Sequence, residues 1–358
     1  MKKEKQRKRL VGRGSQLEST GRFESVKLVQ LEAEDAEAKR KVPTQFFDDD
    51  SQSIVSSNSS PDLFLNLSLN PYRGCVHGCS YCYARPTHEY LGWGPGLDFE
   101  SKIVVKRNAG ALFRKWLARR KVSEIEPVMI SGVTDCYQPP EKQFEVTRDC
   151  LRAALEFRHP VHLITKNSLI MRDIDLLKQL ADLNLVAATI SITSLEQSLI
   201  RIMEPRTSSP QSRLETVAAL SDVGVPVFVF VAPVIPAIND DEIPEILKQA
   251  KAHGAAGAGY IVLRLPITVK EVFDDWLQVH FADRREKVLG RIESLRGGKL
   301  NSSVFGERMR GTGVWADQFR TLFKTFANKH GLDTTRPKLR TDLFQIVDAT
   351  GRTQQTMF

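Results

Sequence analysis

Apolar runs alternate with amphipathic segments along the chain from Leu63 onward. Each run is almost continuously apolar, which is typical of parallel strands covered on both faces. Between the runs, apolar residues recur every three or four positions, as from Ile243 to Ala250, which predicts helices. A short extra strand is predicted at Ile103–Lys106, outside the main series. The predicted main strands are Leu63–Leu69, Pro127–Gly132, Val161–Thr165, Val186–Ile192, Val227–Val231 and Tyr260–Leu263.

This alternation of strands and helices predicts an α/β fold. A full TIM barrel needs eight strand–helix units, and about six are present, so we expect a partial (βα)6 TIM-like barrel. After Pro266 the pattern changes to helices only. Apolar stripes predict helices within residues 269–281, 288–295 and 315–326, and we interpret their aromatic residues as packing rather than as a cofactor site. The chain should therefore end in a helical extension that covers one end of the barrel.

The composition divides the chain into four predicted parts. Residues 1–60 are basic at first and serine-rich at the end, contain few apolar residues, and are predicted to be disordered. The barrel is expected over residues 61–266 and the helical extension over residues 267–335. Residues 336–358 are expected to be loosely structured.

Positive charge is concentrated at the N-terminus. The formal net charge is +8, and residues 1–14 contribute +6, from seven Lys or Arg and one acid, Glu4. The rest of the chain is therefore close to neutral. A basic tail can attract nucleic acid without sequence specificity, although a solvated tail is the more common interpretation. No stacking platform of aromatic and basic residues is evident in the sequence.

The cysteine content and the apolar runs predict a cytoplasmic protein. The longest apolar run, Val225–Ile238, is interrupted by three prolines and is too short to cross a bilayer as a helix, which takes about 20 apolar residues. The basic N-terminus lacks the apolar core of a secretory signal. Five cysteines, three of them clustered, do not form a disulfide framework, and they suit a reducing compartment.

The three clustered cysteines are Cys75, Cys79 and Cys82, with the spacing Cys-x3-Cys-x2-Cys. Gly74 and Gly78 allow the backbone to turn tightly around them. Three thiolates that converge in one loop suit a soft metal or an iron–sulfur cluster. Ordinary clusters use four cysteines, so three would leave one iron open for another ligand.

Other uses of these thiols stay open at this point. His77 lies between the first two cysteines, so a structural zinc site with three cysteines and one histidine is an alternative. The second ligand pair of a usual zinc finger is missing, however. A disulfide or inert thiols are a further alternative. Cys136 or Cys150 could supply a fourth ligand, but both are distant in the sequence.

Polar residues follow several predicted strands directly. Thr134 and Asp135 follow the second main strand, Lys166 follows the third, and Ser191 lies at the end of the fourth. In α/β barrels the active groups lie at the carboxyl ends of the strands. Each of these residues alone is more commonly a turn or cap residue. Polar residues at the carboxyl ends of several strands of one barrel nevertheless predict a ligand site.

The spacing Cys-x3-Cys-x-aromatic-Cys, with Tyr81 at the aromatic position, resembles the cluster loop of the radical SAM superfamily. The resemblance implies a 4Fe–4S cluster held by Cys75, Cys79 and Cys82, with S-adenosylmethionine on the open iron. It also implies reductive cleavage of S-adenosylmethionine to methionine and a 5′-deoxyadenosyl radical, which abstracts hydrogen from a substrate. A reductant such as flavodoxin or ferredoxin would supply the electron. The partial barrel is the fold expected of that superfamily.

A more specific resemblance is to the spore photoproduct lyase-like branch of this superfamily. It implies that Thr134 helps to hold the methionine amino group. Lys166 and Ser191 would reach the carboxylate and the ribose, and Tyr81 would lie near the adenine. Such pairings are chemically sensible, since a lysine suits a carboxylate and a hydroxyl suits a ribose. The similar stretches are Thr134-Asp135, Thr165-Lys166, Ser191-Ile192-Thr193, Glu204-Pro205 and Val231-Ala232-Pro233.

One position departs from that branch. Spore photoproduct lyase has a hydrogen-donating cysteine two residues before the position that matches Thr134, and Gly132 stands there in this chain. Repair of the thymine photoproduct is therefore not expected. An alternative hypothesis is that Cys136 or Tyr137 relays a hydrogen atom, although a buried structural cysteine is the more common interpretation of Cys136.

The sequence thus predicts a radical SAM enzyme whose catalytic residues are unassigned. Its substrate would be a nucleic acid, a protein or a small molecule. The alternative is a non-catalytic protein that uses zinc or an iron–sulfur cluster for structure or electron transfer.

Overall fold

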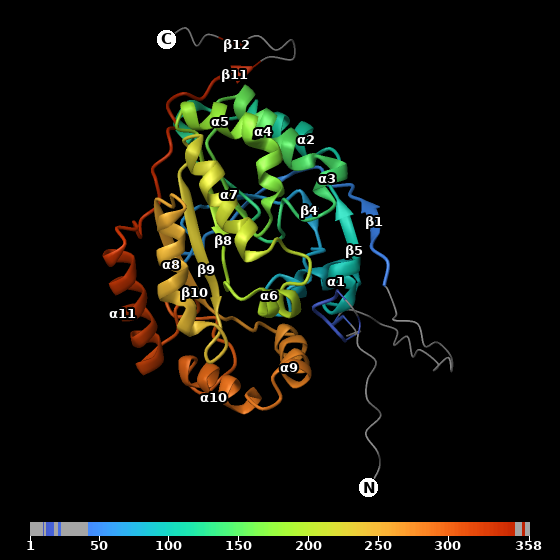
Figure 1. Cartoon of the computed structure of the whole chain (residues 1–358). Coiled ribbons are helices and arrows are strands. Elements are labelled where there is room, and N and C mark those ends of the chain that lie inside the picture. The colour runs from blue at the N-terminus through green and yellow to red at the C-terminus, as the bar shows by residue number, and fades with distance from the viewer. Residues whose placement is uncertain (1–9, 11, 18–20, 23–41, 348–352, 355–358) are drawn as a thin grey trace.

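The computed structural model describes residues 10, 12–17, 21–22, 42–347 and 353–354 (Figure 1). Its main sheet has seven strands in the order β10-β9-β8-β7-β6-β3-β2. Six of them are parallel and follow the chain order, and β2 (Val55–Ser57) pairs antiparallel with β3 at one edge. The parallel strands are β3 (Leu67–Leu69), β6 (Val128–Ile130), β7 (Val161–Thr165), β8 (Val186–Ser191), β9 (Val227–Val234) and β10 (Gly257–Val262). The predicted partial (βα)6 barrel is confirmed.

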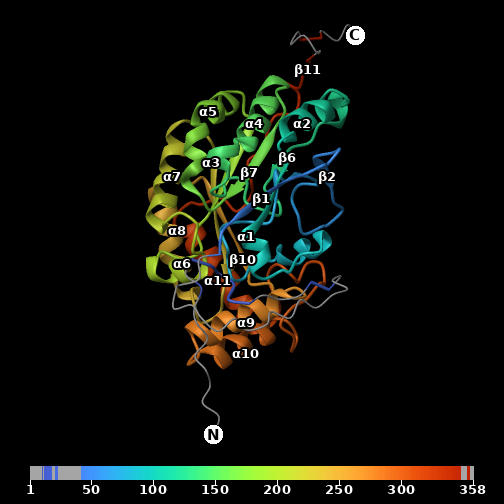
Figure 2. The same cartoon turned by 90° about the vertical axis from the view of Figure 1, so that its right-hand side faces the viewer.

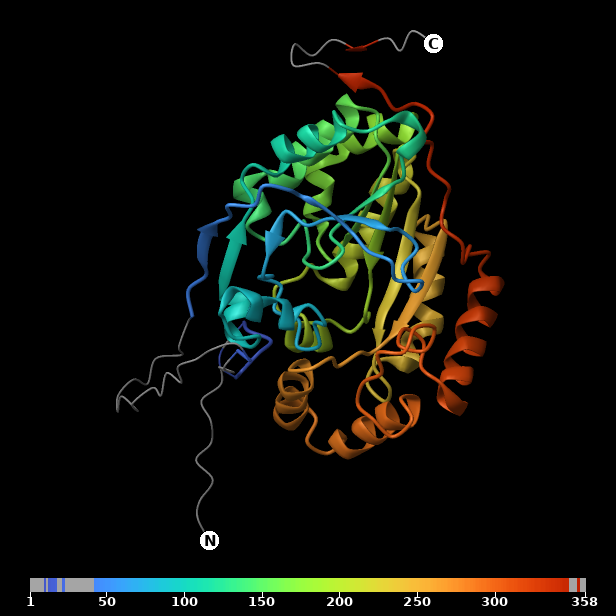
Figure 3. The same cartoon turned by 180° about the vertical axis from the view of Figure 1, so that it is seen from behind.

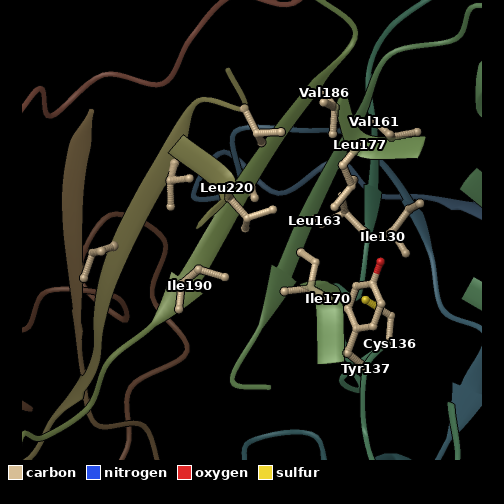
Figure 4. Packing of buried hydrophobic residues seen from close by; sticks show 14 of the residues in the cluster. Ile130, Cys136, Tyr137, Val161, Leu163, Ile170, Leu177, Val186, Ile190 and Leu220 are labelled. Atoms are coloured by element: carbon tan, nitrogen blue, oxygen red, sulfur yellow. The ribbon is translucent and has the colours of Figure 1, made fainter. Parts of the chain in front are cut away.

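Helices cover the outer face of this sheet (Figures 1 and 2). They are α2 (Ala109–Leu117), α4 (Val146–Glu156), α5 (Ile174–Asp182), α7 (Pro210–Asp222) and α8 (Ile243–Ala252). Alternate strand residues point toward these helices, because successive side chains of a strand point to opposite faces. Figure 4 shows Val161, Leu163, Val186 and Ile190 packed with Leu177 of α5 and Leu220 of α7. Full burial of each such side chain contributes about 1.5–3 kcal/mol.

A smaller sheet lies beside the barrel. Its order is β1 (Gln45–Asp48), β5 (Lys102–Val105) and β4 (Tyr72–Arg73), so the predicted extra strand is indeed outside the main series. The helix α1 (Leu97–Ser101) leads directly into β5. A 3₁₀ helix, Arg85–Leu91, follows the three clustered cysteines. Shorter elements are α3 (Glu141–Phe144), α6 (Gln197–Met203) and the 3₁₀ helices Val122–Glu124, Ser168–Asp173 and Asp240–Glu242.

The predicted helical extension is present as α9 (Val269–His280), α10 (Arg285–Leu295) and α11 (Gly313–Lys329). The helices α9 and α10 lie with α6 at the end of the barrel toward which the strands run (Figure 1). Trp276 of α9 is almost completely buried, and its Nε1 donates a hydrogen bond to the Ile202 carbonyl at 2.9 Å. The aromatic stripe therefore serves packing, as predicted. No helix among the described residues is long and apolar enough to span a membrane.

Both ends of the chain are more ordered than predicted where the structure describes them. The prediction for residues 1–60 is wrong for β1 and β2, while residues 1–9, 11, 18–20 and 23–41 lie outside the described part. The C-terminal segment runs back along the barrel (Figure 3) and ends in β11 (Ile346–Val347) and β12 (Thr353–Gln354). Phe344 is buried there, and the Gln345 amide donates to the Phe157 carbonyl at 3.1 Å. Residues 336–347 are therefore packed rather than loose, and the exact domain boundaries stay a prediction.

Candidate active site at the carboxyl ends of the strands

The loop that contains the three cysteines, residues 74–83 and called here the cluster loop, lies against α1 and α6. The Cys75 amide donates to the Phe99 carbonyl at 2.9 Å, and the Ser80 amide donates to the Met203 carbonyl at 3.1 Å. Gly74 has a φ of +76°, and a Cβ there would lie 2.9 Å from the Lys102 carbonyl oxygen. A glycine is thus required at this turn.

The three thiols of the cluster loop fit an iron–sulfur cluster by their chemistry. All are free, Cys75 and Cys79 are only 7% exposed, and Cys82 is half-buried and packs beside both. Burial raises the pKa of Cys82 to about 11, with a further increase from Cys75. A raised pKa favours the protonated thiol. Bound iron would favour the thiolate instead, because cysteines bind metals in the deprotonated form. Three soft donors in a shielded loop match a cluster that takes one thiolate at each of three irons.

His77, the alternative zinc ligand, is engaged elsewhere. Its Nδ1 lies 3.4 Å from Oδ2 of Asp135, and its Nε2 lies 3.2 Å from the side-chain amide of Asn167. Burial opposes the charged ring, but Asp135 and Cys75 outweigh it and raise the pKa of His77 to about 10. Neither ring nitrogen is free for a metal. Among the described residues, no three His, Cys, Asp or Glu side chains converge closely enough to hold a single metal ion.

Two of the predicted site residues, Tyr81 and Lys166, meet at the buried carboxylate of Glu204. The Tyr81 hydroxyl donates to Glu204, and the Lys166 Nζ lies 3.5 Å from the same carboxylate oxygen. The Lys166 Nζ also lies 5.8 Å from the centre of the Tyr81 ring. Thr193 donates to that oxygen at 2.6 Å, and Arg213 of α7 donates to the other at 2.5 Å. Tyr81 and Lys166 thus belong to one connected network next to the cluster loop.

Thr134 and Asp135 follow the end of β6, and Asp135 connects it to this network. The Thr134 hydroxyl donates to the Tyr72 carbonyl at 2.8 Å, immediately before the cluster loop. Asp135 accepts from the Lys166 amide at 2.8 Å and from the Thr165 hydroxyl at 2.7 Å. Thr134 therefore lies at the predicted edge, but its described hydroxyl bond is to backbone and not to Lys166.

Ser191, the fourth predicted site residue, ends β8 and is buried. It lies opposite Phe230 of β9 in the sheet register, and its carbonyl accepts from Arg213 at 3.0 Å. Arg213 thereby links Ser191 to Glu204. The structure brings Ser191 to the same end of the barrel as Lys166, one strand away.

A group of arginines and exposed aromatic rings joins the two edges of the open sheet. Arg308 pairs with Asp62 at 2.5 Å and lies over the Phe305 ring at 4.5 Å. Arg264 lies 5.7 Å from the centre of the Tyr83 ring. Tyr83 is 47% exposed and Phe305 is 56% exposed. We call these residues the arginine–aromatic patch; sequence patterns do not indicate it, because its members come from loops far apart in the chain.

The charges of this patch are unbalanced. Burial and the neighbouring charge of Arg308 lower the pKa of Arg264, and Asp62 is the carboxylate that both arginines share. The loop that carries Arg308 is held to β10 by the Val262 amide, which donates to the Met309 carbonyl at 2.9 Å. Asp62 belongs to the connection between β2 and β3, at the opposite edge of the sheet.

A model of the radical SAM superfamily matches residues 69–250, which is half of the chain. The chain belongs to the radical SAM superfamily. Members of this family use a 4Fe–4S cluster and S-adenosylmethionine. The matched residues include the cluster loop, the Glu204 network and four complete parallel strands, β6 to β9.

Two curated relatives of this radical SAM protein are uncharacterized. One, from Mycobacterium tuberculosis (strain ATCC 25618 / H37Rv), is 36% identical over 212 residues, which are 59% of this chain and 62% of the relative. The other, from Methanocaldococcus jannaschii, is 31% identical over 174 residues, or 49% of this chain and 62% of the relative. The match thus spans less than two thirds of either relative.

The fold of this radical SAM protein is similar to that of spore photoproduct lyase. A mutant lyase with bound AdoMet and dinucleoside spore photoproduct superimposes with a TM-score of 0.59 at 16% identity, over 82% of this chain and 86% of the lyase. A second mutant lyase gives a TM-score of 0.58 at 17% identity over 80% of each chain. At this identity the likeness concerns the fold.

The hydrogen-relay hypothesis for Cys136 and Tyr137 does not agree with their positions. Both are fully buried in the core between the sheet and the outer helices (Figure 4). The Cys136 thiol lies 3.9 Å from the Ile164 carbonyl, and the Tyr137 hydroxyl donates to Asp173 at 3.1 Å. Burial raises the pKa of Cys136 well above its usual value. The structural interpretation of Cys136 is the better one.

Sequence reasoning missed Arg213 as a residue of the radical SAM site and gave Glu204 no role, although Glu204-Pro205 is one of the stretches that carry the resemblance. Glu204 directly follows α6, and Arg213 lies on α7, so both belong to helical segments rather than to strand ends. The similar stretch Glu204-Pro205 is the signal that could have identified Glu204. Glu204 and Arg213 are nine residues apart, and the periodicity of a helix or strand does not indicate that they pair.

Proposed function

We propose that Cys75, Cys79 and Cys82 hold the 4Fe–4S cluster of this radical SAM enzyme. The observation that carries the proposal is the buried cluster loop, which contains three free thiols together with Tyr81, whose hydroxyl meets Lys166 at Glu204. When bound, the cluster supplies the electron that cleaves S-adenosylmethionine to methionine and a 5′-deoxyadenosyl radical, which abstracts hydrogen from the substrate.

The residues at the carboxyl ends of β6, β7 and β8 would bind S-adenosylmethionine. Lys166 would pair with its carboxylate, because the ammonium lies beside the cluster loop and its described contacts, apart from Glu204, are neutral oxygens of Thr193 and Ala232. Ser191 would face the ribose, Tyr81 the adenine and Thr134 the amino group. Glu204 would keep Tyr81 and Lys166 in place.

For the substrate we propose a nucleic acid. The arginine–aromatic patch supports this, since an uncompensated arginine next to exposed rings suits phosphates and stacked bases. A structurally similar lyase binds a dinucleoside photoproduct. Gly132 stands where that lyase branch has its hydrogen-donating cysteine, so we do not propose repair of the same lesion. Five free cysteines suit a reducing cytoplasm, where a flavodoxin or ferredoxin would deliver the electron.

The chemistry is tested by anaerobic reconstitution with iron and sulfide, followed by reduction with S-adenosylmethionine present. We expect 5′-deoxyadenosine, detected by mass, from the native chain. Replacement of any one of Cys75, Cys79 and Cys82 by Ala should abolish it together with the bound iron. Cys150→Ala, a change within α4, is the matched control and should retain both. A cluster that survives Cys79→Ala would show that the ligand set is wrong.

The outcome also separates this proposal from the non-catalytic alternative. A stable cluster without any nucleoside product, with substrate candidates present, would favour an electron carrier. Zinc without iron would favour a structural metal site.

The nucleic-acid proposal is tested by binding of a short fluorescent single-stranded oligonucleotide at several salt concentrations. Arg264→Gln should weaken binding and reduce the slope of log affinity against log salt by about 0.7 for one lost phosphate contact. Lys248→Gln, at an exposed pair on α8, is the control and should change neither. Equal affinities of the native chain and Arg264→Gln would show that the arginine–aromatic patch does not contribute to oligonucleotide binding.

A further inference from the structure

A short N-terminal segment, Gly12–Leu17, lies against the cluster loop although it is more than fifty residues away in the sequence (Figure 3). We call it the N-terminal strap. Gly14 is its point of closest approach: a Cβ there would overlap the Gly78 carbonyl oxygen and would lie 3.2 Å from the Ser80 amide nitrogen. Only a glycine allows this contact between the two backbones.

The strap is bound to the cluster loop through the carboxylate of Glu100. Glu100 is fully buried in α1, and it accepts from the Gly14 amide at 3.1 Å and from the Ser15 amide at 2.7 Å. It also pairs with the Arg85 guanidinium at 2.6 Å. Arg85 in turn donates two hydrogen bonds to the Cys79 carbonyl, at 2.8 and 3.1 Å. A continuous chain of contacts therefore runs from the strap to the backbone of a proposed cluster ligand.

Both ends of the strap are held as well. The Arg13 guanidinium donates to the Glu100 carbonyl and to the Val42 carbonyl, each at 2.7 Å. The Leu17 carbonyl accepts from the Leu97 amide at 3.1 Å. The Gly12 carbonyl accepts from Arg206 at 2.9 Å. Arg13 is almost completely buried, so it is not part of the solvated basic charge predicted for residues 1–14.

We propose that the N-terminal strap holds the cluster loop in the shape that retains the cluster, with Glu100 as the positioning residue that couples them. The inference rests on the proposed ligand set. Gly78 and its neighbours form a glycine-containing loop with few internal hydrogen bonds, and such a loop loses order easily when outside contacts are removed. The strap, Glu100 and Arg85 supply part of those contacts from outside the loop, around Gly78 and Cys79.

The first test compares Gly14→Ala with Gly290→Ala after reconstitution. Gly290 is exposed on α10, and a Cβ added there would meet nothing within 4 Å, so its replacement should leave iron retention unchanged. Gly14→Ala should release iron to a chelator at least fivefold faster than the native chain. Its reduced cluster should also give an altered electron paramagnetic resonance spectrum. The melting temperature of its iron-free form should stay within about 2 °C of the native value.

A second test uses two truncations, because removal of residues 1–14 would cut the strap and the basic tail together. Removal of residues 1–9 takes away six of the seven N-terminal cations and leaves the strap. Removal of residues 1–17 takes away both. We expect native iron retention in the first and rapid loss in the second, and Glu100→Gln should resemble the second.

The outcomes distinguish the strap from the proposed ligand set. If the native chain binds no cluster, the proposed function fails. If it does, and Gly14→Ala and the longer truncation retain iron like the native chain, the strap inference alone is refuted. A large fall in the melting temperature of iron-free Gly14→Ala would also refute it, because the strap would then support the whole fold rather than the cluster loop.

Discussion

Replacement of Glu204 by Gln removes one negative charge from the centre of the active-site network and nearly preserves the shape of the side chain. Glu204 is almost completely buried, and its carboxylate accepts from Arg213 at 2.5 Å and from Thr193 at 2.6 Å. Lys166 lies 3.5 Å away. The glutamine side chain ends in one carbonyl oxygen and one NH2 group. Arg213 therefore loses its charged partner, and the NH2 group faces other hydrogen-bond donors.

The cost of this change follows from the burial of Arg213. Its side chain is only 1% exposed, so water cannot replace the lost carboxylate. Removal of one partner of a buried ion pair costs about 3–5 kcal/mol, because the other charge is left uncompensated. The neutral acceptors that remain for Arg213, the carbonyls of Ser191 and Ser208 and the hydroxyl of Thr207, favour the lower part of this range.

The pH dependence has a defined sign. Burial alone would raise the pKa of Glu204, but Arg213 and Lys166 outweigh it and hold the pKa well below its usual range. A carboxyl group with a depressed folded-state pKa stabilises the fold above its unfolded pKa of about 4.3, and this stabilisation declines as the pH falls further. The stability difference between native protein and Glu204→Gln should be constant from pH 8 to about pH 5 and smaller below that.

The assay is urea unfolding of the iron-free protein, followed by circular dichroism, at pH 7.5 and at pH 4. Glu215→Gln is the matched control, because Glu215 is exposed on α7 and contacts Gln211 only at the surface. It should change the free energy of unfolding by less than about 0.5 kcal/mol. A loss below 1 kcal/mol for Glu204→Gln at pH 7.5, or a loss that grows on acidification, would refute the reasoning.

Three further predictions concern single side chains. Lys166→Met should weaken binding of S-adenosylmethionine to the reconstituted protein about 10- to 100-fold, because it removes a charged hydrogen bond worth about 1.5–3 kcal/mol. Replacement of the exposed Lys178 of α5 by Met should leave this binding unchanged. Equilibrium dialysis measures both. Cys136→Ala should lower the free energy of unfolding by about 1–3 kcal/mol and leave deuterium return to S-adenosylmethionine unchanged; a lost return would restore the relay hypothesis. Phe319→Ala in the buried face of α11 should cost about 3–5 kcal/mol, against less than about 0.5 for the exposed neighbour Val314→Ala.

The main strands were predictable because burial on both faces leaves a continuous apolar run. The prediction for β7, Val161–Thr165, matches residue for residue. The strand β1, Gln45–Asp48, was missed because all four of its residues are exposed and its sequence lacks that signal. It is a strand because its backbone pairs with β5, and that pairing is a tertiary contact.

The candidate site was predictable in the cluster loop and at the ends of the strands, where the sequence carries a local signal. The cluster loop places three thiols within eight residues, so the sequence alone indicates its use. The N-terminal strap is bound mainly through backbone amides that reach Glu100, and backbone contacts leave no pattern of side-chain types. Glu204 likewise gains its role from residues on other elements, which periodicity cannot identify.

The charges around the cluster loop explain why one cation there is suited to a ligand. Asp135 faces the His77 ring at 3.4 Å, and Glu204 pairs with Arg213 at 2.5 Å, so each of these two buried acids has a basic partner of its own. Lys166 lies between these pairs: its amide donates to Asp135, and its ammonium reaches the Glu204 carboxylate already shared with Arg213. Two carboxylates therefore face three basic side chains. The carboxylate of a ligand would balance the remaining positive charge at Lys166, beside the loop where the cluster is expected.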